Sequence, residues 1–204
     1  MTLATRPTTP RTGATPPRAA RHLTNTLDPK NVILALVALI GVGNHGLPGL
    51  GWALIAALFC AVLPVLGIKY GVRRGRWSDR YVGKRQQRLI VIPLVMVSVV
   101  AGLLLMLLTG APRELTAMVL SMLITLTVIL AITTVWKVSA HTAVSSGAIV
   151  MLATGLGPWW LMAYPLVPLV GWSRVALRDH TIAQTIVGAL VGAATAGVAF
   201  AVLR

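Results

Sequence analysis

Acidic side chains are scarce in this sequence. Four Asp and Glu stand against 18 Lys and Arg, which gives a formal net charge of +14 at pH 7. Charged residues of both signs make up only 11% of the chain and hydrophobic residues make up 56%, whereas an ordinary soluble domain is about 25% charged. This composition excludes an ordinary soluble domain and indicates an integral membrane protein.

Cysteine is nearly absent too. Cys60 is the only one, and it lies inside an apolar run. A single cysteine excludes an internal disulfide framework, and no Cys/His cluster has the spacing of metal ligands. We therefore expect no metal and no cofactor, and we interpret Cys60 as a small buried hydrophobic residue.

The excess of positive charge does not follow one soluble face. Basic residues are spread between apolar runs, which argues against nucleic acid as a partner. Anionic lipid headgroups or phosphates are the partners that this distribution favours.

The chain divides into two parts. Residues 1–29 are rich in Thr, Pro, Arg and Ala without apolar periodicity, which predicts a disordered basic tail. They lack the apolar core of a secretory signal, while an organelle transit peptide is an alternative. Residues 30–204 form the predicted membrane-embedded domain.

Seven apolar runs follow one another within that domain, joined by short connections that contain Gly and Pro. Because three of them are shorter than the roughly 20 residues that span a bilayer, we predict an all-α, polytopic membrane helical bundle with six or seven hydrophobic segments. Gly188, Gly192 and Ala196 form a small-residue stripe that predicts close packing on a neighbouring helix of the same chain. The runs are 32–47, 50–70, 89–109, 114–136, 143–156, 158–172 and 181–203.

Three polar stretches interrupt the apolar runs, at residues 73–88, 137–142 and 171–184. Two runs separate each stretch from the next, so the three should meet on one face of the membrane, with Arg113 and Glu114 on the other. Ionisable groups clustered at a membrane are usually functional. As alternatives, arginines 73, 74 and 76 could be loop charges that set topology, and Lys137 an interfacial anchor.

The combined polar stretches suit an anion. They offer guanidinium and ammonium groups, a serine hydroxyl and two imidazoles, with hardly a carboxylate. The planar fork of arginine matches phosphate oxygens, and imidazole titrates near neutrality, as a nucleophile and a proton donor require. The pattern predicts phosphoryl transfer without a metal.

Two motifs carry a family resemblance. Ser173 and Arg174 are followed by five residues, His180, three residues and Gln184, while Ser139 and His141 enclose one alanine. These segments resemble the Ser-Arg-x5-His-x3-Asp and Pro-Ser-Gly-His motifs of the type 2 phosphatidic acid phosphatase superfamily, the lipid phosphate phosphatases related in site to vanadium haloperoxidases. The basic run 80–88 approximates the family's Lys-x6-Arg-Pro motif, and the resemblance covers residues 50 to 200.

The resemblance implies a role for each residue. His180 would attack phosphorus to form a phosphohistidine, and His141 would protonate the departing lipid alcohol. Which basic residues of the first motif fill the family's Lys and Arg roles stays open. The side chains that would bind the phosphate oxygens are those of Arg174, Ser173, Ser139, Arg80, Lys84, Arg85 and Arg88.

Gln184 stands where the family has an aspartate that accepts the other ring N–H of the nucleophilic histidine. Residues four apart share a helix face, so the amide oxygen of Gln184 can reach His180, but it supplies no negative charge. Asp179 would lie about 100° around such a helix, and we interpret it as neutralising Arg174 or Arg178. The site is then either that of an enzyme that works with Gln or a degenerate anion site.

We therefore predict a membrane phosphatase that hydrolyses a lipid-linked phosphate, such as phosphatidate, phosphatidylglycerol phosphate or a polyprenyl (pyro)phosphate. The alternatives are a catalytically degenerate anionic-lipid-binding or carrier protein and a structural membrane subunit. If residues 32–47 span, 16 of the 18 Lys and Arg lie on the site face, which predicts a cytoplasmic site, although many family members act on the outer face. The Arg over Lys excess hints at a bacterial plasma membrane.

Overall fold

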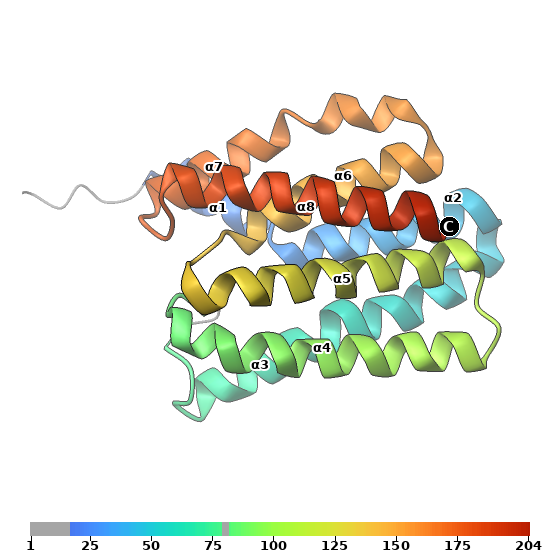
Figure 1. The fold of residues 1–204 in the computed structure, drawn as a ribbon, viewed down its shortest axis with the longest axis horizontal. Coiled ribbons are helices and arrows are strands. Elements are labelled where there is room, and N and C mark those ends of the chain that lie inside the picture. The colour runs from blue at the N-terminus through green and yellow to red at the C-terminus, as the bar shows by residue number, and fades with distance from the viewer. Residues whose placement is uncertain (1–16, 79–81) are drawn as a thin grey trace, which may run out of the picture.

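The structure, a computed structural model, describes residues 17–78 and 82–204, and the regular elements in these ranges are all helices, without a strand. Figure 1 shows the helices running side by side along one direction, with connections gathered at two ends. The elements are α1 (Arg18–Thr26), α2 (Pro29–Ala57), the π-helical turn η1 (Leu58–Val62), α3 (Leu63–Arg73), α4 (Arg85–Leu108), α5 (Arg113–Val135), α6 (Ala140–Leu156), the 3-10 turn η2 (Pro158–Ala163), α7 (Leu166–Ala176) and α8 (Ile182–Leu203).

Helix α2 is a hairpin of two arms. Asp28 caps its start, where the carboxylate accepts a hydrogen bond from the Lys30 N–H at 3.1 Å. Gly46 breaks the helix with a φ of 59°, a conformation that glycine adopts without steric cost, and the chain reverses there (Figure 1). The arms touch near the bend, because a Cβ on Gly49 would lie 2.0 Å from the Gly41 carbonyl oxygen. The run 32–47 corresponds to the first arm, and the run 50–70 corresponds to the second arm continued through η1 and most of α3.

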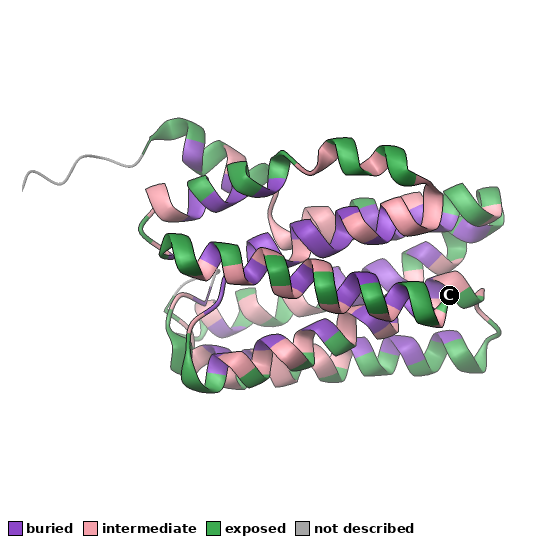
Figure 2. Ribbon diagram, turned by 45° about the horizontal axis from the view of Figure 1, so that its top comes forward, coloured by how far each residue is buried: buried purple, intermediate pink, exposed green. Residues whose placement is uncertain are grey.

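Four helical stretches of the described chain are long and apolar enough to cross a membrane: Arg18–Arg73, which contains the reversal, Arg85–Leu108, Arg113–Val135 and Ile182–Leu203. Helix α6 is apolar but has only 17 residues. Outward positions carry large apolar side chains, such as Val97 and Leu108 on α4, while buried positions face the centre of the bundle (Figure 2). An all-helical membrane protein, as predicted, accounts for apolar side chains on both the inside and the outside.

The small-residue stripe of α8 lies against α6, so the predicted packing within the chain is confirmed. A Cβ added to Gly192 would lie 2.0 Å from the Ala143 carbonyl oxygen, and one added to Gly188 would lie 2.5 Å from that of Ser139. The two backbones are therefore in direct contact. This contact fixes how the start of α8 sits relative to the start of α6.

The disorder predicted for residues 1–29 is not found in the described part of that segment. Residues 18–26 form helix α1, which packs on α7. Ala20 and Thr24 are its buried residues, and the Thr24 hydroxyl lies 2.8 Å from that of Ser173. This buried face holds one small and one polar residue, so it leaves no apolar periodicity in the sequence. Residues 1–16 lie outside the described range.

The polar stretches meet at one end of the bundle, as the crossing pattern predicted. That end holds α1, the start of α2 and the α3–α4, α5–α6 and α7–α8 connections, at the left of Figure 1. Arg113 and Arg204 lie at the other end, where His45 Nε2 is 3.0 Å from Glu114 Oε2. Three basic residues are outside the described ranges, so 13 of the 18 Lys and Arg lie at the first end.

Candidate functional site

A capping box at the start of α8 orients His180. The Thr181 hydroxyl accepts the Gln184 N–H at 3.3 Å, and Gln184 Oε1 accepts the Thr181 N–H at 3.2 Å. The same Oε1 lies 3.0 Å from His180 Nδ1. Because Oε1 must be the oxygen that accepts a backbone N–H, the amide orientation is fixed, and Nδ1 is the ring nitrogen that donates. Nε2 of the neutral ring therefore carries the lone pair.

The predicted contact between Gln184 and His180 is confirmed, but for a different reason. His180 precedes the N-cap residue Thr181 and is not part of α8, so the two residues do not share a helix face. The contact arises from the capping box, whose Thr-x-x-Gln spacing is a known signature of a helix start. That spacing is the sequence signal for the geometry of this turn.

Arg88 lies on the other side of the imidazole. Its Nη2 is 3.5 Å from His180 Nε2, and the residue is only 7% exposed. Nε donates to the Val82 carbonyl and Nη1 donates to the Val138 carbonyl, both at 2.8 Å. The guanidinium thus joins the segment before α4, the α5–α6 connection and the nucleophile candidate.

Arg174 and Lys137 hold the turn that carries His180. Arg174 is 1% exposed, and its Nη2 lies 2.8 Å from Asp179 Oδ2, an ion pair that confirms one of the two partners expected for Asp179. Lys137 Nζ donates to the Asp179 carbonyl at 2.6 Å. Arg178 adopts a φ of 59° in this turn. The contact of Lys137 with the Asp179 carbonyl was not predicted from the sequence, which offered interfacial anchoring as an alternative for this residue.

This surrounding lowers the pKa of His180 from 6.5 to about 3. Burial is the main cause, because it disfavours the charged ring, and the cations of Arg88, Lys137 and Arg174 add to it. The hydrogen bond to Gln184 opposes the shift. The imidazole is consequently neutral near pH 7, and Nε2 keeps the unprotonated form that a nucleophile requires, with its lone pair facing the Arg88 guanidinium.

The motif that contains Ser139 and His141 is joined to the motif that ends at Gln184 by a backbone hydrogen bond. The Ser139 N–H donates to the Gln184 carbonyl at 3.1 Å, and the Ser139 hydroxyl caps α6 by accepting the Thr142 N–H at 3.4 Å. His141 follows in the first turn of α6 and is 6% exposed. The structure therefore brings the predicted His141 and His180 to the same end of the bundle.

Other predicted phosphate ligands lie elsewhere. The Ser173 hydroxyl donates to the Val170 carbonyl at 2.8 Å and contacts α1, so it belongs to the α1–α7 interface. Arg85 is exposed and donates to the Thr133 and Thr134 carbonyls at the end of α5. Lys84 is exposed at the N-cap of α4, and Arg80 lies outside the described residues. Of the described basic residues in the first motif, Arg88 is the one that reaches His180.

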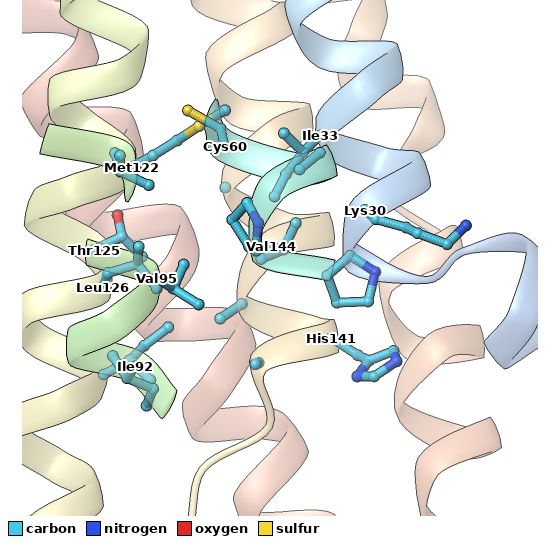
Figure 3. Close-up of a pocket in the computed structure, with 18 of the residues that line it drawn as sticks. Lys30, Ile33, Cys60, Ile92, Val95, Met122, Thr125, Leu126, His141 and Val144 are labelled. Atoms are coloured by element: carbon cyan, nitrogen blue, oxygen red, sulfur yellow. The ribbon is translucent and has the colours of Figure 1, made fainter. Parts of the chain in front are cut away.

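A cavity of about 320 Å³ opens beside these residues, between α2, α3, α4, α5 and α6. His141 lines it together with Ile92, Cys60 and Met122, and Lys30 stands at its margin on the same side as His141 (Figure 3). Its ionisable lining is grouped at the site end of the bundle, and the deeper lining is mainly apolar. The ionisable residues at that end are Asp28, Lys30, Lys69, Arg88 and His141.

Comparison of the chain with family models, curated proteins and solved structures finds no match in any of the three. The geometry of the site combines a neutral, oriented imidazole with buried guanidinium groups, and an apolar cavity adjoins it.

Proposed function

We propose that this protein is a metal-independent phosphatase of lipid-linked phosphates, as the resemblance to the type 2 phosphatidic acid phosphatases implies. The observation that carries the proposal is the position of His180. Gln184 holds its Nδ1–H, and Nε2 accepts a long hydrogen bond from Arg88 at 3.5 Å, which a phosphate oxygen bound to that guanidinium would replace. A phosphate bound by that guanidinium would present its phosphorus to a nucleophile.

The reaction then has two steps. His180 Nε2 forms a bond to phosphorus while the bond from phosphorus to the lipid oxygen breaks, and His141 gives the leaving alkoxide its proton. Water next attacks the phosphohistidine with His141 as the base, which releases inorganic phosphate and restores His180. Arg88 and Arg174 stabilise the charge on the non-bridging oxygens.

The substrate itself supplies charge that Gln184 does not. The phosphohistidine ring carries a positive charge on its imidazole, and in this site the amide of Gln184 accepts its N–H without neutralising it. The oxygens of the bound phosphate lie close to that ring and are negative, so they favour the charged ring. A neutral acceptor at position 184 is therefore compatible with the mechanism.

The charge distribution favours a cytoplasmic site in a bacterial plasma membrane. Thirteen described basic residues lie at the site end, against Arg113 and Arg204 at the other. Basic residues near the ends of spans are retained on the cytoplasmic side. Labelling single cysteines placed at residues 113 and 178 in a Cys60→Ala background, from outside intact cells, tests this orientation.

The activity is tested with purified protein in detergent containing a chelator and a panel of phosphatidate, phosphatidylglycerol phosphate and polyprenyl phosphates. We expect release of inorganic phosphate from the wild type and its loss in His180→Ala and His141→Ala. His45→Ala, at the opposite end of the bundle, is the matched control and should retain activity. Release that persists in His180→Ala would exclude the phosphohistidine.

A second candidate is an anionic-lipid-binding or carrier protein with a degenerate site. The uncharged Gln184 at the position of the family's aspartate favours it, since the guanidinium groups that bind an anion remain. Binding of the same lipids without phosphate release, weakened by Arg88→Gln and insensitive to His180→Ala, would support this candidate over the enzyme.

A further inference from the structure

The cavity extends from the site end deep into the bundle. Its lining on α6 begins at Ala140 and His141 and continues to Met151. Eleven residues of helix rise about 16 Å, which is roughly half of the 30 Å hydrocarbon core of a bilayer. The space therefore starts at the polar residues and ends near the middle of the membrane.

The α2 hairpin gives the cavity its shape. Its arms are in backbone contact at Gly41 and Gly49, close to the bend. Helix α2 contacts η1, which follows it directly, whereas α2 and α3 make few contacts. The arms thus separate toward the site end, where Lys30 and Lys69 line the mouth.

Small and flexible side chains surround the deep end. Cys60 and Met122 lie there together in Figure 3, far from His141. Ala148, Met151 and Ala196 complete this part of the lining, and both alanines and Met151 belong to the buried core. The deep end is therefore closed by packed protein rather than by lipid.

We propose that this cavity holds one hydrocarbon chain of the lipid whose phosphate binds at Arg88, and that its closed end limits the length of that chain. The headgroup part of this inference rests on the proposed function. A volume of about 320 Å³ is at the low end of the roughly 300–1,000 Å³ range of ligand pockets. It accommodates one chain and leaves any second chain of the lipid in the bilayer.

The length of the bound hydrocarbon chain is selected by how well it fits the cavity, and not by its hydrophobicity. A chain that moves from the bilayer into the cavity exchanges one apolar environment for another, so it gains little from the hydrophobic effect. A chain that reaches the deep end must displace packed side chains, which lowers its apparent affinity by about tenfold or more. Chains that fill the cavity without reaching that limit are preferred.

The test uses hexyl, dodecyl and octadecyl phosphate with wild-type protein and Ala148→Leu, which shortens the cavity. Ala131→Leu is the matched control, because Ala131 is exposed on α5 and does not line the cavity. Two readouts are taken: release of inorganic phosphate, and the affinity of each alkyl phosphate in the His180→Ala background, measured by titration calorimetry. The second readout needs no catalysis.

We expect dodecyl phosphate to bind at least about tenfold more tightly than octadecyl phosphate, because the longer chain must displace the packed side chains at the closed end. Ala148→Leu should shift the preferred chain to a shorter one, while Ala131→Leu keeps the wild-type preference. Binding that depends on chain length, without phosphate release from any of the three phosphates, would support the chain site and refute the enzyme. Phosphate release at equal rates and binding of equal affinity for all three chains would refute the chain site and leave the enzyme intact.

Discussion

Replacing Gln184 with Glu probes the contact that defines the site. Gln184 Oε1 lies 3.0 Å from His180 Nδ1, and a glutamate carboxylate can occupy the same place. Glutamate also suits the third position of a capping box, where a negative charge near the helix N-terminus is favourable. The fold of α8 should therefore be kept while one charge is added beside the imidazole.

The size of the effect follows from the distance. Two unit charges about 4 Å apart interact by about 4 kcal/mol at an effective dielectric constant of about 20. Gln184 is half-buried, so solvent screening reduces this to about 2 to 4 kcal/mol. The carboxylate should raise the pKa of His180 and increase the ratio of protonated to neutral ring by about 30-fold to 1,000-fold.

NMR titration of histidine-labelled protein in detergent measures this ratio, because the chain has only four histidines and His180→Gln identifies the signal. Gln184→Met is the control: it removes the acceptor and should lower the pKa of His180 slightly. Identical titration of His180 in Gln184→Glu and wild type would refute the contact.

In a phosphatase, faster turnover of Gln184→Asp would mark Gln as an impairment, and slower turnover would mark it as adapted.

Three further outcomes follow from the geometry. Arg88→Lys should lower phosphate affinity by about tenfold in a binding assay and the free energy of unfolding by about 1 to 3 kcal/mol in thermal unfolding, because an ammonium cannot keep all three contacts of the guanidinium. The control Arg85→Lys should change neither quantity. Ser173→Ala should lower the free energy of unfolding by about 1 kcal/mol and leave phosphate affinity unchanged, since the Ser173 hydroxyl faces α1. Weakened phosphate binding in this variant would show that Ser173 is a phosphate ligand after all. The pKa of His180 falls from 6.5 to about 3 on folding. The stability that depends on the neutral ring is therefore complete above pH 6.5 and is lost as the pH falls toward 3. The free energy of unfolding of His180→Gln should accordingly depend less on pH in this range.

The sequence predicted the all-helical architecture correctly, but of the six or seven predicted segments only four helical stretches of the described chain are long enough to span a membrane. Apolar runs and Gly/Pro junctions located the helices, and the alternation of crossings was enough to place the polar stretches at one end. The stripe at Gly188 and Gly192 also indicated its partner correctly, because small residues at spacing four have few uses other than close helix contact. These features depend on order along the chain.

The directions of individual side chains were harder to predict. Arg85 and Arg88 are both basic and lie one turn apart, yet Arg85 binds carbonyls at the end of α5 and Arg88 reaches His180. The Ser173 hydroxyl contacts helix α1. The sequence did not reveal this helix, because the buried face of α1 holds only Ala20 and Thr24. The cavity was likewise hidden, since it depends on how the arms of α2 separate.

The backbone contact between α6 and α8 has a consequence for how mutations at this protein will be read. The separation of the two histidine-bearing segments is maintained partly at Gly192, where a single added methyl group would collide with the Ala143 carbonyl. If the protein is the proposed phosphatase, a random screen for inactive variants should therefore recover changes at this glycine, in the middle of the apolar helix α8. Such a variant could be mistaken for one at a distant regulatory position, although it changes only the separation between the two helices.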